Sequence, residues 1–225
     1  MPHPPDLAAR INELRWFHQI DFGDGLMSPG WVKKPKIERM KRLFFDRPLA
    51  GKSVLDIGCW DGAYSIAATQ LGAARVVASD WFVWNHGLGD KRAFELARAI
   101  LAPSVELVEA PVEELTVERL GQFDIVLFAG VFYHILHPTP LLEQVAKLAR
   151  EVLVFESRLC GIPGQLTSKP LMRFYPNGSL DNDPTNYWAP NPACMKALLR
   201  QIGFSKVKFQ RADRRFRRGL CHAEW

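Results

Sequence analysis

Five short runs rich in Val, Ile, Leu and Phe recur along the chain, and they constrain its fold more than any other feature. Such near-continuous apolar runs are typical of strands that are covered on both faces of a parallel sheet. Helical stripes separate them, for example Phe94, Ala97 and Leu101. This alternation predicts a doubly wound α/β fold with right-handed crossovers. The runs are "SVLDIG" (53–58), "RVVASD" (75–80), "VELVEA" (105–110), "FDIVLFAG" (123–130) and "EVLVFES" (151–157).

The C-terminal part of the chain completes the sheet. The helical pattern "PACMKALLRQI" ends at Gly203, a favourable C-terminal cap, and "FSKVKFQ" alternates as a strand does. "RRGLCHAEW" can return as its antiparallel partner, so we expect a Rossmann-like sheet of seven strands with an antiparallel last strand. We expect one domain over 1–225, made of an N-terminal helical lid (1–48), a ligand-binding core (49–157), a substrate-covering insertion (158–190) and a C-terminal helix with a strand hairpin (191–225).

Composition excludes several classes of protein. The chain has 225 residues, 48% hydrophobic and 24% charged, as in ordinary globular proteins. It contains no apolar run long enough to span a membrane, and its beginning has no secretory pattern, so we expect a cytoplasmic protein without a membrane partner. The four cysteines are too scattered for a metal site or a disulfide framework, and no metal is expected. A monomer or a homodimer fits these features.

The charge of +5 is concentrated in two basic clusters, within residues 33–42 and 206–218. Such clusters attract phosphates or nucleic acid, although a solvated surface is the more ordinary interpretation. No recognised nucleic-acid-binding motif accompanies them.

The first apolar run leads into a glycine turn, "GCWDG", and then into a predicted helix. In doubly wound folds this arrangement holds an adenosine-containing ligand, because glycine allows close approach and the helix end offers free N–H donors. The second run ends in Asp80, where an acidic side chain accepts hydrogen bonds from ribose hydroxyls. Asp56, Gly58, Gly62 and Asp80 therefore indicate a nucleoside ligand.

The spacing of this turn disfavours a dinucleotide. The pattern G-x-G-x-x-G is absent, because Trp60 occupies the position at which a middle glycine admits a pyrophosphate. The Lys-Ser/Thr pair of a P-loop is also missing. S-adenosylmethionine fits better, since it has a ribose, an adenine and a zwitterionic tail but no phosphate.

The motif "VLDIGCWDG" resembles the first motif of class I S-adenosylmethionine-dependent methyltransferases, with Asp80 matching their ribose acid. "EAPVEEL" (109–115) is similar to their adenine-flanking stretch, and "FDIVLFAGVFYHILHP" (123–138) to their fourth-strand motif. More specifically, the chain resembles the tRNA wobble-uridine carboxymethyltransferase family and its small relatives, through "QID" (19–21), "GVFYHILHP" and "NYWAPNPACMKALLRQIGF" (186–204). The resemblance implies that S-adenosylmethionine is held by Asp56, Gly58, Gly62, Asp80, Val112, Glu113 and Gly130. Cys59, Trp60 and Trp81 are further candidate cofactor contacts, and the structural alternative for Trp60 is a residue that anchors the first helix.

One departure from that family concerns the methyl donor. The wobble-uridine enzyme grips a carboxylated S-adenosylmethionine in part through a tyrosine just after the last glycine of the turn, and Ala63 stands at that place here. Arg218 matches a basic residue of the family's closing strand, but an arginine alone is weak support. We therefore expect ordinary S-adenosylmethionine as the donor.

Two residues after the fourth predicted strand are candidates for catalysis. His134 is the candidate general base, and Tyr133 the candidate hydroxyl that orients the substrate. The structural alternatives are a histidine that caps a turn and a buried, hydrogen-bonded tyrosine. Candidate substrate-binding residues come from the N-terminal lid, the insertion and the closing strand: Trp16, His18, Tyr175, Asn186, Tyr187, Trp188 and Arg218.

Together these features predict transfer of a methyl group to an oxygen or nitrogen of a polar small molecule, such as a sugar or a natural-product intermediate. The first alternative is a tRNA wobble-uridine methyl- or carboxymethyltransferase. The alternative from another class is a non-catalytic, nucleoside-binding partner subunit.

Overall fold

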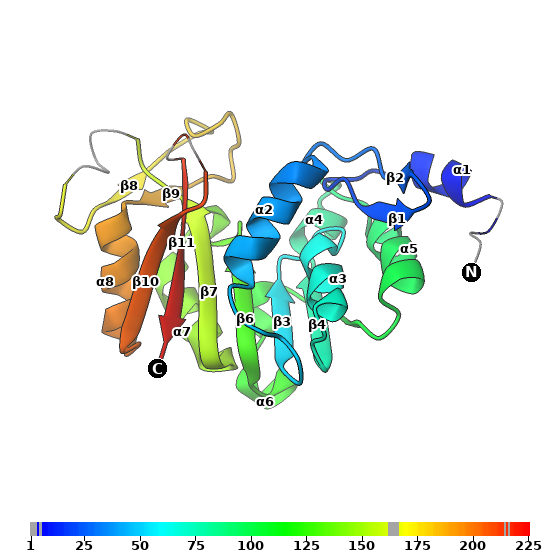
Figure 1. The fold of residues 1–225 in the computed structure, drawn as a ribbon. Coiled ribbons are helices and arrows are strands. Elements are labelled where there is room, and N and C mark those ends of the chain that lie inside the picture. The colour runs from blue at the N-terminus through cyan, green and yellow to red at the C-terminus, as the bar shows by residue number, and fades with distance from the viewer. Residues whose placement is uncertain (1–3, 5, 162–166, 214, 216) are drawn as a thin grey trace. The chain divides into compact units, whose positions relative to one another are not determined.

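A computed structural model describes residues 4, 6–161, 167–213, 215 and 217–225. The chain divides into two compact units, Met1–Pro111 and Val112–Trp225, called here the N-terminal and C-terminal units. Figure 1 shows the order of their elements along the chain. The expectation of a single domain stays a prediction.

Three parallel strands form the sheet of the N-terminal unit. They are β3 (Ser53–Ile57), β4 (Arg75–Asp80) and β5 (Glu106–Glu109), with β4 in the middle. Helix α3 (Ala63–Gln70) packs against β3 and β4, while α4 (Phe82–Asn85) and α5 (Lys91–Leu101) connect β4 to β5. Four of the five residues of β3 are buried, as the apolar run predicted.

The N-terminal segment of this unit contains two helices and a small hairpin. They are α1 (Leu7–Asn12), β1 (Asp21–Gly23), β2 (Leu26–Met27) and α2 (Lys34–Phe44). Helix α2 begins with Pro35 in its first turn and buries Ile37, Met40 and Phe44, the face that its sequence predicted.

Four strands form the sheet of the C-terminal unit. Strand β6 (Phe123–Ala129) runs parallel to β7 (Ala149–Arg158), and β11 (Arg218–Glu224) pairs antiparallel with both β7 and β10 (Lys206–Arg211). Helix α7 (Pro138–Leu148) packs against β6 and β7, and α8 (Pro192–Ile202) packs against β10 and β11 (Figure 1). Helix α8 ends at Gly203 as predicted, with φ of 123°. The remaining helical segments are η1 (Val112–Glu114), α6 (Val117–Leu120) and η2 (Phe132–His134).

All seven predicted strands are confirmed, including the antiparallel last strand. The predicted insertion 158–190 contains more regular structure than its composition indicated. Strand β8 (Met172–Phe174) pairs antiparallel with β9 (Trp188–Pro190), and Tyr175 N–H donates to the Tyr187 carbonyl at 2.7 Å. Residues 162–166 of the insertion lie outside the described part of the chain.

The described residues contain neither a membrane-spanning helix nor a cluster of metal-binding side chains. None of the helices there is long and apolar enough to cross a bilayer. No group of three or more His, Cys, Asp or Glu side chains in the same part of the chain is placed to hold a metal ion.

Candidate functional site

The glycine turn of the N-terminal unit lies beside the end of β4. Strands β3 and β4 are parallel, with Asp56 opposite Ala78, so their carboxyl ends meet at one edge of the sheet. The N–H groups of Gly58 and Cys59 both donate to the Ser79 carbonyl, at 2.8 and 3.1 Å, which ties the turn to β4. The structure therefore brings together the turn and the acidic residue that the sequence singled out separately.

Asp80 is held in place by backbone donors. The N–H groups of Trp60 and Trp81 donate to separate carboxylate oxygens of Asp80, at 2.9 and 2.8 Å, and Val83 N–H donates at 3.4 Å. The residue is only 6% exposed, and this burial raises the pKa of its carboxyl while the three N–H donors oppose the rise. A carboxylate has about four acceptor positions, so these donors leave room for a further one.

Asp56 lies at the buried end of β3, where it accepts a hydrogen bond of 2.6 Å from the Ser65 hydroxyl. Burial raises the pKa of its carboxyl to about 6, against the lowering effects of Ser65 and His18. A nearby cation would stabilise the ionised form of this carboxyl.

The pKa of the Cys59 thiol reflects the negative electrostatic potential at the turn. Its thiol is buried, and burial together with the charges of Asp80, Asp56 and Asp61 raises its pKa well above the ordinary value. The thiol therefore stays protonated at neutral pH. Three carboxylates around one turn favour a cationic ligand and disfavour a diphosphate.

The backbone of the turn requires Gly62 and tolerates Trp60. Gly62 has φ of 80°, and a Cβ there would lie 2.8 Å from the Phe94 ring. Trp60 also has a positive φ, 55°, which is rare for a large residue. Its N–H donates to Asp80 and its carbonyl accepts from the Trp84 indole at 3.0 Å, so two side chains stabilise this conformation.

Asp61 attaches the N-terminal segment to the turn, a role that sequence reasoning missed. Its carboxylate accepts from the N–H groups of Phe17 and His18, at 2.9 and 2.8 Å, and also contacts Nδ1 of the His18 ring. The Phe17 ring stacks on Trp60 with centroids 4.1 Å apart. The predicted lid residue His18 therefore lies next to the turn.

Trp16 has a different environment from its neighbour His18. It is 3% exposed, its indole donates to the Ile11 carbonyl at 2.8 Å, and its ring packs edge-on against Phe22. These contacts place it in the core of the N-terminal segment. Trp81, predicted to cover the cofactor, is partly buried and its ring packs edge-on against His86.

In the C-terminal unit, Val112 and Glu113 belong to the short helix η1. The Gln144 side chain holds this segment, because its amide donates to the carbonyls of Glu113 and Leu115 at 2.8 and 3.0 Å. Gly130 follows β6 with φ of 78°. A Cβ at Gly130 would lie 3.6 Å from the Arg218 guanidinium, so the chain passes close to that side chain.

Arg218, which is partly exposed, forms a polar cluster with the buried Glu156 and Tyr133. Nε of Arg218 donates to Glu156 Oε1 at 2.5 Å, and Nη2 donates to Oε2 at 2.8 Å. Both Nη atoms also lie 3.1–3.2 Å from the Tyr133 hydroxyl, whose pKa is raised by burial. The charge of Arg218 is therefore already matched by Glu156, which is 2% exposed.

His134 is linked to the insertion by a hydrogen-bonded chain. Its Nδ1 lies 2.8 Å from Oγ1 of Thr185, and that hydroxyl lies 2.6 Å from Oδ1 of Asp183. Burial lowers the pKa of His134, and Asp183 opposes this effect. Neither Thr185 nor Asp183 was singled out from the sequence.

The other predicted substrate-binding residues lie along the insertion. Tyr187 N–H donates to the Tyr133 carbonyl at 2.8 Å, and the Trp188 indole donates to the Leu136 carbonyl at 3.0 Å. Tyr175 packs in a small apolar cluster with Cys160 and Ala189. Asn186 is 4% exposed and its side-chain amide donates to the Leu180 carbonyl, while its Oδ1 has no hydrogen-bond partner among the residues that the structure describes.

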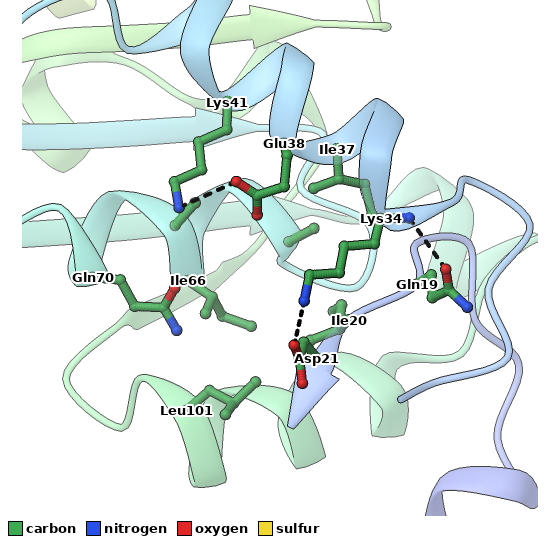
Figure 2. Close-up of a pocket in the computed structure, with 12 residues that line it drawn as sticks. Gln19, Ile20, Asp21, Lys34, Ile37, Glu38, Lys41, Ile66, Gln70 and Leu101 are labelled. Carbon is green, nitrogen blue, oxygen red and sulfur yellow. Dashed lines mark hydrogen bonds and ion pairs between the residues drawn. The ribbon is translucent and has the colours of Figure 1, made fainter. Parts of the chain in front are cut away.

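Figure 2 shows a groove of the N-terminal unit that is lined by residues of α2, α3, α5 and the segment around β1. Its volume of about 70 Å³ is far below that of a typical ligand pocket, and its lining combines apolar residues such as Ile20, Ile37 and Ile66 with polar and charged ones. At its rim Lys34 pairs with Asp21 at 2.5 Å, and Lys41 lies 3.8 Å from Glu38. Part of the basic cluster at 33–42 is thus neutralised within the fold.

A sequence model described as a methyltransferase domain matches residues 31–208. The chain belongs to this methyltransferase domain family. The predicted family is therefore confirmed. A tRNA U34 carboxymethyltransferase of Campylobacter jejuni subsp. jejuni serotype O:6 is 24% identical over 207 residues, which cover 90% of this chain and 66% of that protein. A ubiquinone biosynthesis O-methyltransferase of Bordetella avium is 34% identical over 105 residues, covering 45% of this chain and 40% of that protein.

Among solved structures, the N-terminal domain of EvdMO1, crystallised in the presence of SAH and D-fucose, is similar to this methyltransferase domain. Its TM-score is 0.69 at 20% identity, covering 99% of this chain and 96% of that one. This similarity confirms the predicted Rossmann-like methyltransferase fold. The chain spans about two thirds, 66%, of the length of the Campylobacter relative.

Proposed function

We propose that this protein is a methyltransferase that uses ordinary S-adenosylmethionine and methylates a hydroxyl oxygen of a polar small molecule. The proposal is carried by the two carboxylates at the ends of β3 and β4. Asp80 is fixed by three N–H donors and keeps acceptor capacity for a ribose, and Asp56 is a buried carboxyl whose ionisation a cation would favour. Both properties fit a cationic nucleoside.

The residues that would hold the donor follow from this arrangement. Asp80 would accept from the ribose hydroxyls, Asp56 would face the methionine portion, and Gly58 and Gly62 would let the backbone of the turn approach. When bound, S-adenosylmethionine supplies a methyl group activated by a sulfonium. In this proposal Val112, Glu113 and Gly130 remain candidate donor contacts.

Arg218 supports an uncarboxylated donor. A carboxylated donor needs an available cation, but the guanidinium of Arg218 already makes two hydrogen bonds to Glu156. Turning the guanidinium toward another carboxylate would leave the buried Glu156 carboxylate without its cation, which is unfavourable. Ala63 adds to this, because its methyl group cannot donate a hydrogen bond.

His134 supports an oxygen acceptor. A hydroxyl needs a base to remove its proton during methyl transfer, and burial keeps His134 neutral by lowering its pKa. Tyr187 and Trp188 offer partly exposed aromatic rings, and the adjacent Asn186 has a buried amide oxygen without a hydrogen-bond partner in the described part of the chain; aromatic rings suit the apolar face of a polyhydroxylated ring. The D-fucose in the EvdMO1 crystals is consistent with a sugar-like acceptor.

The direct test measures transfer of a labelled methyl group from S-adenosylmethionine to panels of free sugars, glycosides and phenols. Calorimetry with S-adenosylhomocysteine provides the binding readout. We expect micromolar binding and transfer to at least one hydroxyl compound. Binding without transfer to any panel member or to tRNA would favour the non-catalytic partner subunit, and absence of binding would refute the proposed donor site.

A tRNA wobble uridine is the second candidate acceptor. The Campylobacter relative, which matches 90% of this chain, favours it, as do the basic residues of β10 and β11. Binding of unmodified tRNA should then weaken steeply with salt, because cations that neutralise phosphates release counterions. Absence of tRNA binding at low salt would eliminate this candidate.

A further inference from the structure

We infer that Thr185 and Asp183 act as positioning residues that fix the tautomer of His134, leaving Nε2 as its unprotonated nitrogen. The inference deepens the proposed function, because it assigns the atom that would take the acceptor's proton. Only the assignment of that proton-accepting role rests on the proposed function. The hydrogen bonds from Asp183 through Thr185 to His134 are present whatever the protein methylates.

The direction of each hydrogen bond follows from the donors that are present. An ionised carboxylate only accepts, so at 2.6 Å from Asp183 the Thr185 hydroxyl must donate its one proton to Oδ1. With that proton committed, Oγ1 is only an acceptor toward His134. Nδ1 of His134, 2.8 Å away, must therefore carry a hydrogen. In a neutral imidazole the lone pair then lies on Nε2.

Backbone contacts keep the chain in this geometry. Thr185 N–H also donates to Asp183 Oδ1, at 2.9 Å, and Asn186 N–H donates to the Asp183 carbonyl at 3.1 Å. Asp183 is thus the first residue of a local turn that presents the Thr185 hydroxyl. Tyr187 N–H donates to the Tyr133 carbonyl at 2.8 Å, which ties the end of the turn to the residue before His134.

The charges around His134 agree with a neutral base. Burial and Arg218 lower its pKa, whereas Asp183 and the contact with Thr185 raise it. The Tyr133 ring, 4.3 Å away between centroids, carries no charge at neutral pH because burial raises its pKa. The imidazole is therefore unprotonated at pH 7 and becomes a stronger base when Asp183 is present.

The chemical consequence is a defined path for one proton. Methyl transfer forms a bond between the acceptor oxygen and the methyl carbon and breaks the carbon–sulfur bond, whose electrons stay on sulfur. The hydroxyl proton passes to Nε2 of His134. The resulting imidazolium is stabilised through Thr185 by the negative charge of Asp183, and the product is a methyl ether.

The tautomer can be measured without a substrate. In protein labelled with ¹⁵N-histidine, two-dimensional spectra distinguish the Nδ1–H and Nε2–H forms, and His134→Gln assigns the signal by its loss. We expect Nδ1–H in the wild type and in Thr185→Ser, and a mixture or the Nε2–H form in Thr185→Val. The exposed Thr139→Val is the matched control and should change nothing. An Nε2–H form in the wild type, or an unchanged tautomer in Thr185→Val, would overturn the inference.

Once an acceptor is known, kinetics test the role of the hydrogen bonds that link His134, Thr185 and Asp183. Thr185→Val should lower kcat about 10- to 100-fold with little change in KM, by analogy with other residues that orient an imidazole, and Thr185→Ser should restore it. Asp183→Asn should move the acidic inflection of the kcat profile to lower pH, because it removes a charge that raises the pKa of His134. A confirmed tautomer with unaltered turnover in His134→Ala would refute the proposed base but leave the positioning role intact.

Discussion

Replacing Asp61 with alanine should destabilise the protein far more than a surface substitution would. The carboxylate is 1% exposed and accepts from the N–H groups of Phe17 and His18 as well as contacting the His18 ring. A buried donor left without a partner costs about 1–3 kcal/mol. Two such donors, and a buried histidine that loses its acidic partner, give an expected loss of about 3–5 kcal/mol in the free energy of unfolding.

Thermal unfolding and amide hydrogen exchange measure this loss. For a chain of this length, 1 kcal/mol corresponds to about 2–4 °C in Tm, so Asp61→Ala should lower Tm by about 6–20 °C. Exchange should accelerate first at the amides of Phe17 and His18. Asp61→Asn keeps one acceptor oxygen and should lose about half as much stability.

Asp90→Ala is the matched control, because Asp90 is a helix N-cap of α5 whose loss costs about 1 kcal/mol. An Asp61→Ala variant with a Tm no lower than that of Asp90→Ala would refute the claim that Asp61 attaches the N-terminal segment to the turn. So would unchanged exchange of the two amides.

The remaining predictions concern the glycine turn and its carboxyls. Gly62→Ala should lower the free energy of unfolding by about 1–2 kcal/mol because of the positive φ, and by about 1–3 kcal/mol more because the new methyl group displaces Phe94. Gly87→Ala is the control, since Gly87 has φ of 69° but open space around it, and it should show only the first loss. Equal losses for the two variants in urea unfolding would contradict the contact with Phe94. Burial raises the pKa of Asp56 to about 6 in the folded protein, so the folded state favours the protonated carboxyl. The contribution of this carboxyl to stability is therefore fully present below pH 4 and is lost as pH rises through 6. Asp56→Asn should therefore stabilise the ligand-free protein at pH 7.5 by up to about 3 kcal/mol but not at pH 4, as urea titrations at both values would reveal. Affinity for S-adenosylhomocysteine should rise between pH 5 and pH 7 in the wild type and be flat in Asp56→Asn when both are followed by calorimetry. Asp80→Ala should weaken that affinity at least tenfold, and an unchanged Kd would mean that the ribose binds elsewhere.

The fold could be predicted because its signals are local. An apolar run marks a strand without reference to the rest of the chain, and Pro35 and Gly203 mark helix ends from within a few residues. The acidic residue Asp80 could be placed for the same reason, since it is the last residue of a strand that the sequence delimits.

The site could be predicted only in part because its supporting contacts are distant in sequence. Asp61 bonds to backbone N–H groups 43 and 44 residues away, and backbone groups leave no trace in the amino-acid sequence. Thr185 lies 51 residues from His134. The pattern Asp-Pro-Thr at 183–185 does indicate a turn in which a side chain accepts from the backbone, but nothing in it identifies which ring the hydroxyl meets.

The ion pair between Arg218 and Glu156 also bears on how the last strand finds its alignment. Arg218 stands directly opposite Arg158 between β11 and β7, and each guanidinium has its own carboxylate, Glu156 and Asp181 respectively. A slip of β11 by two residues would keep every side chain on its own face of the sheet, so apolar packing alone discriminates weakly against it. Such a slip would strand Glu156 in the interior without its cation. The ion pair therefore favours the observed register of β11 on β7 over registers that are shifted by two residues.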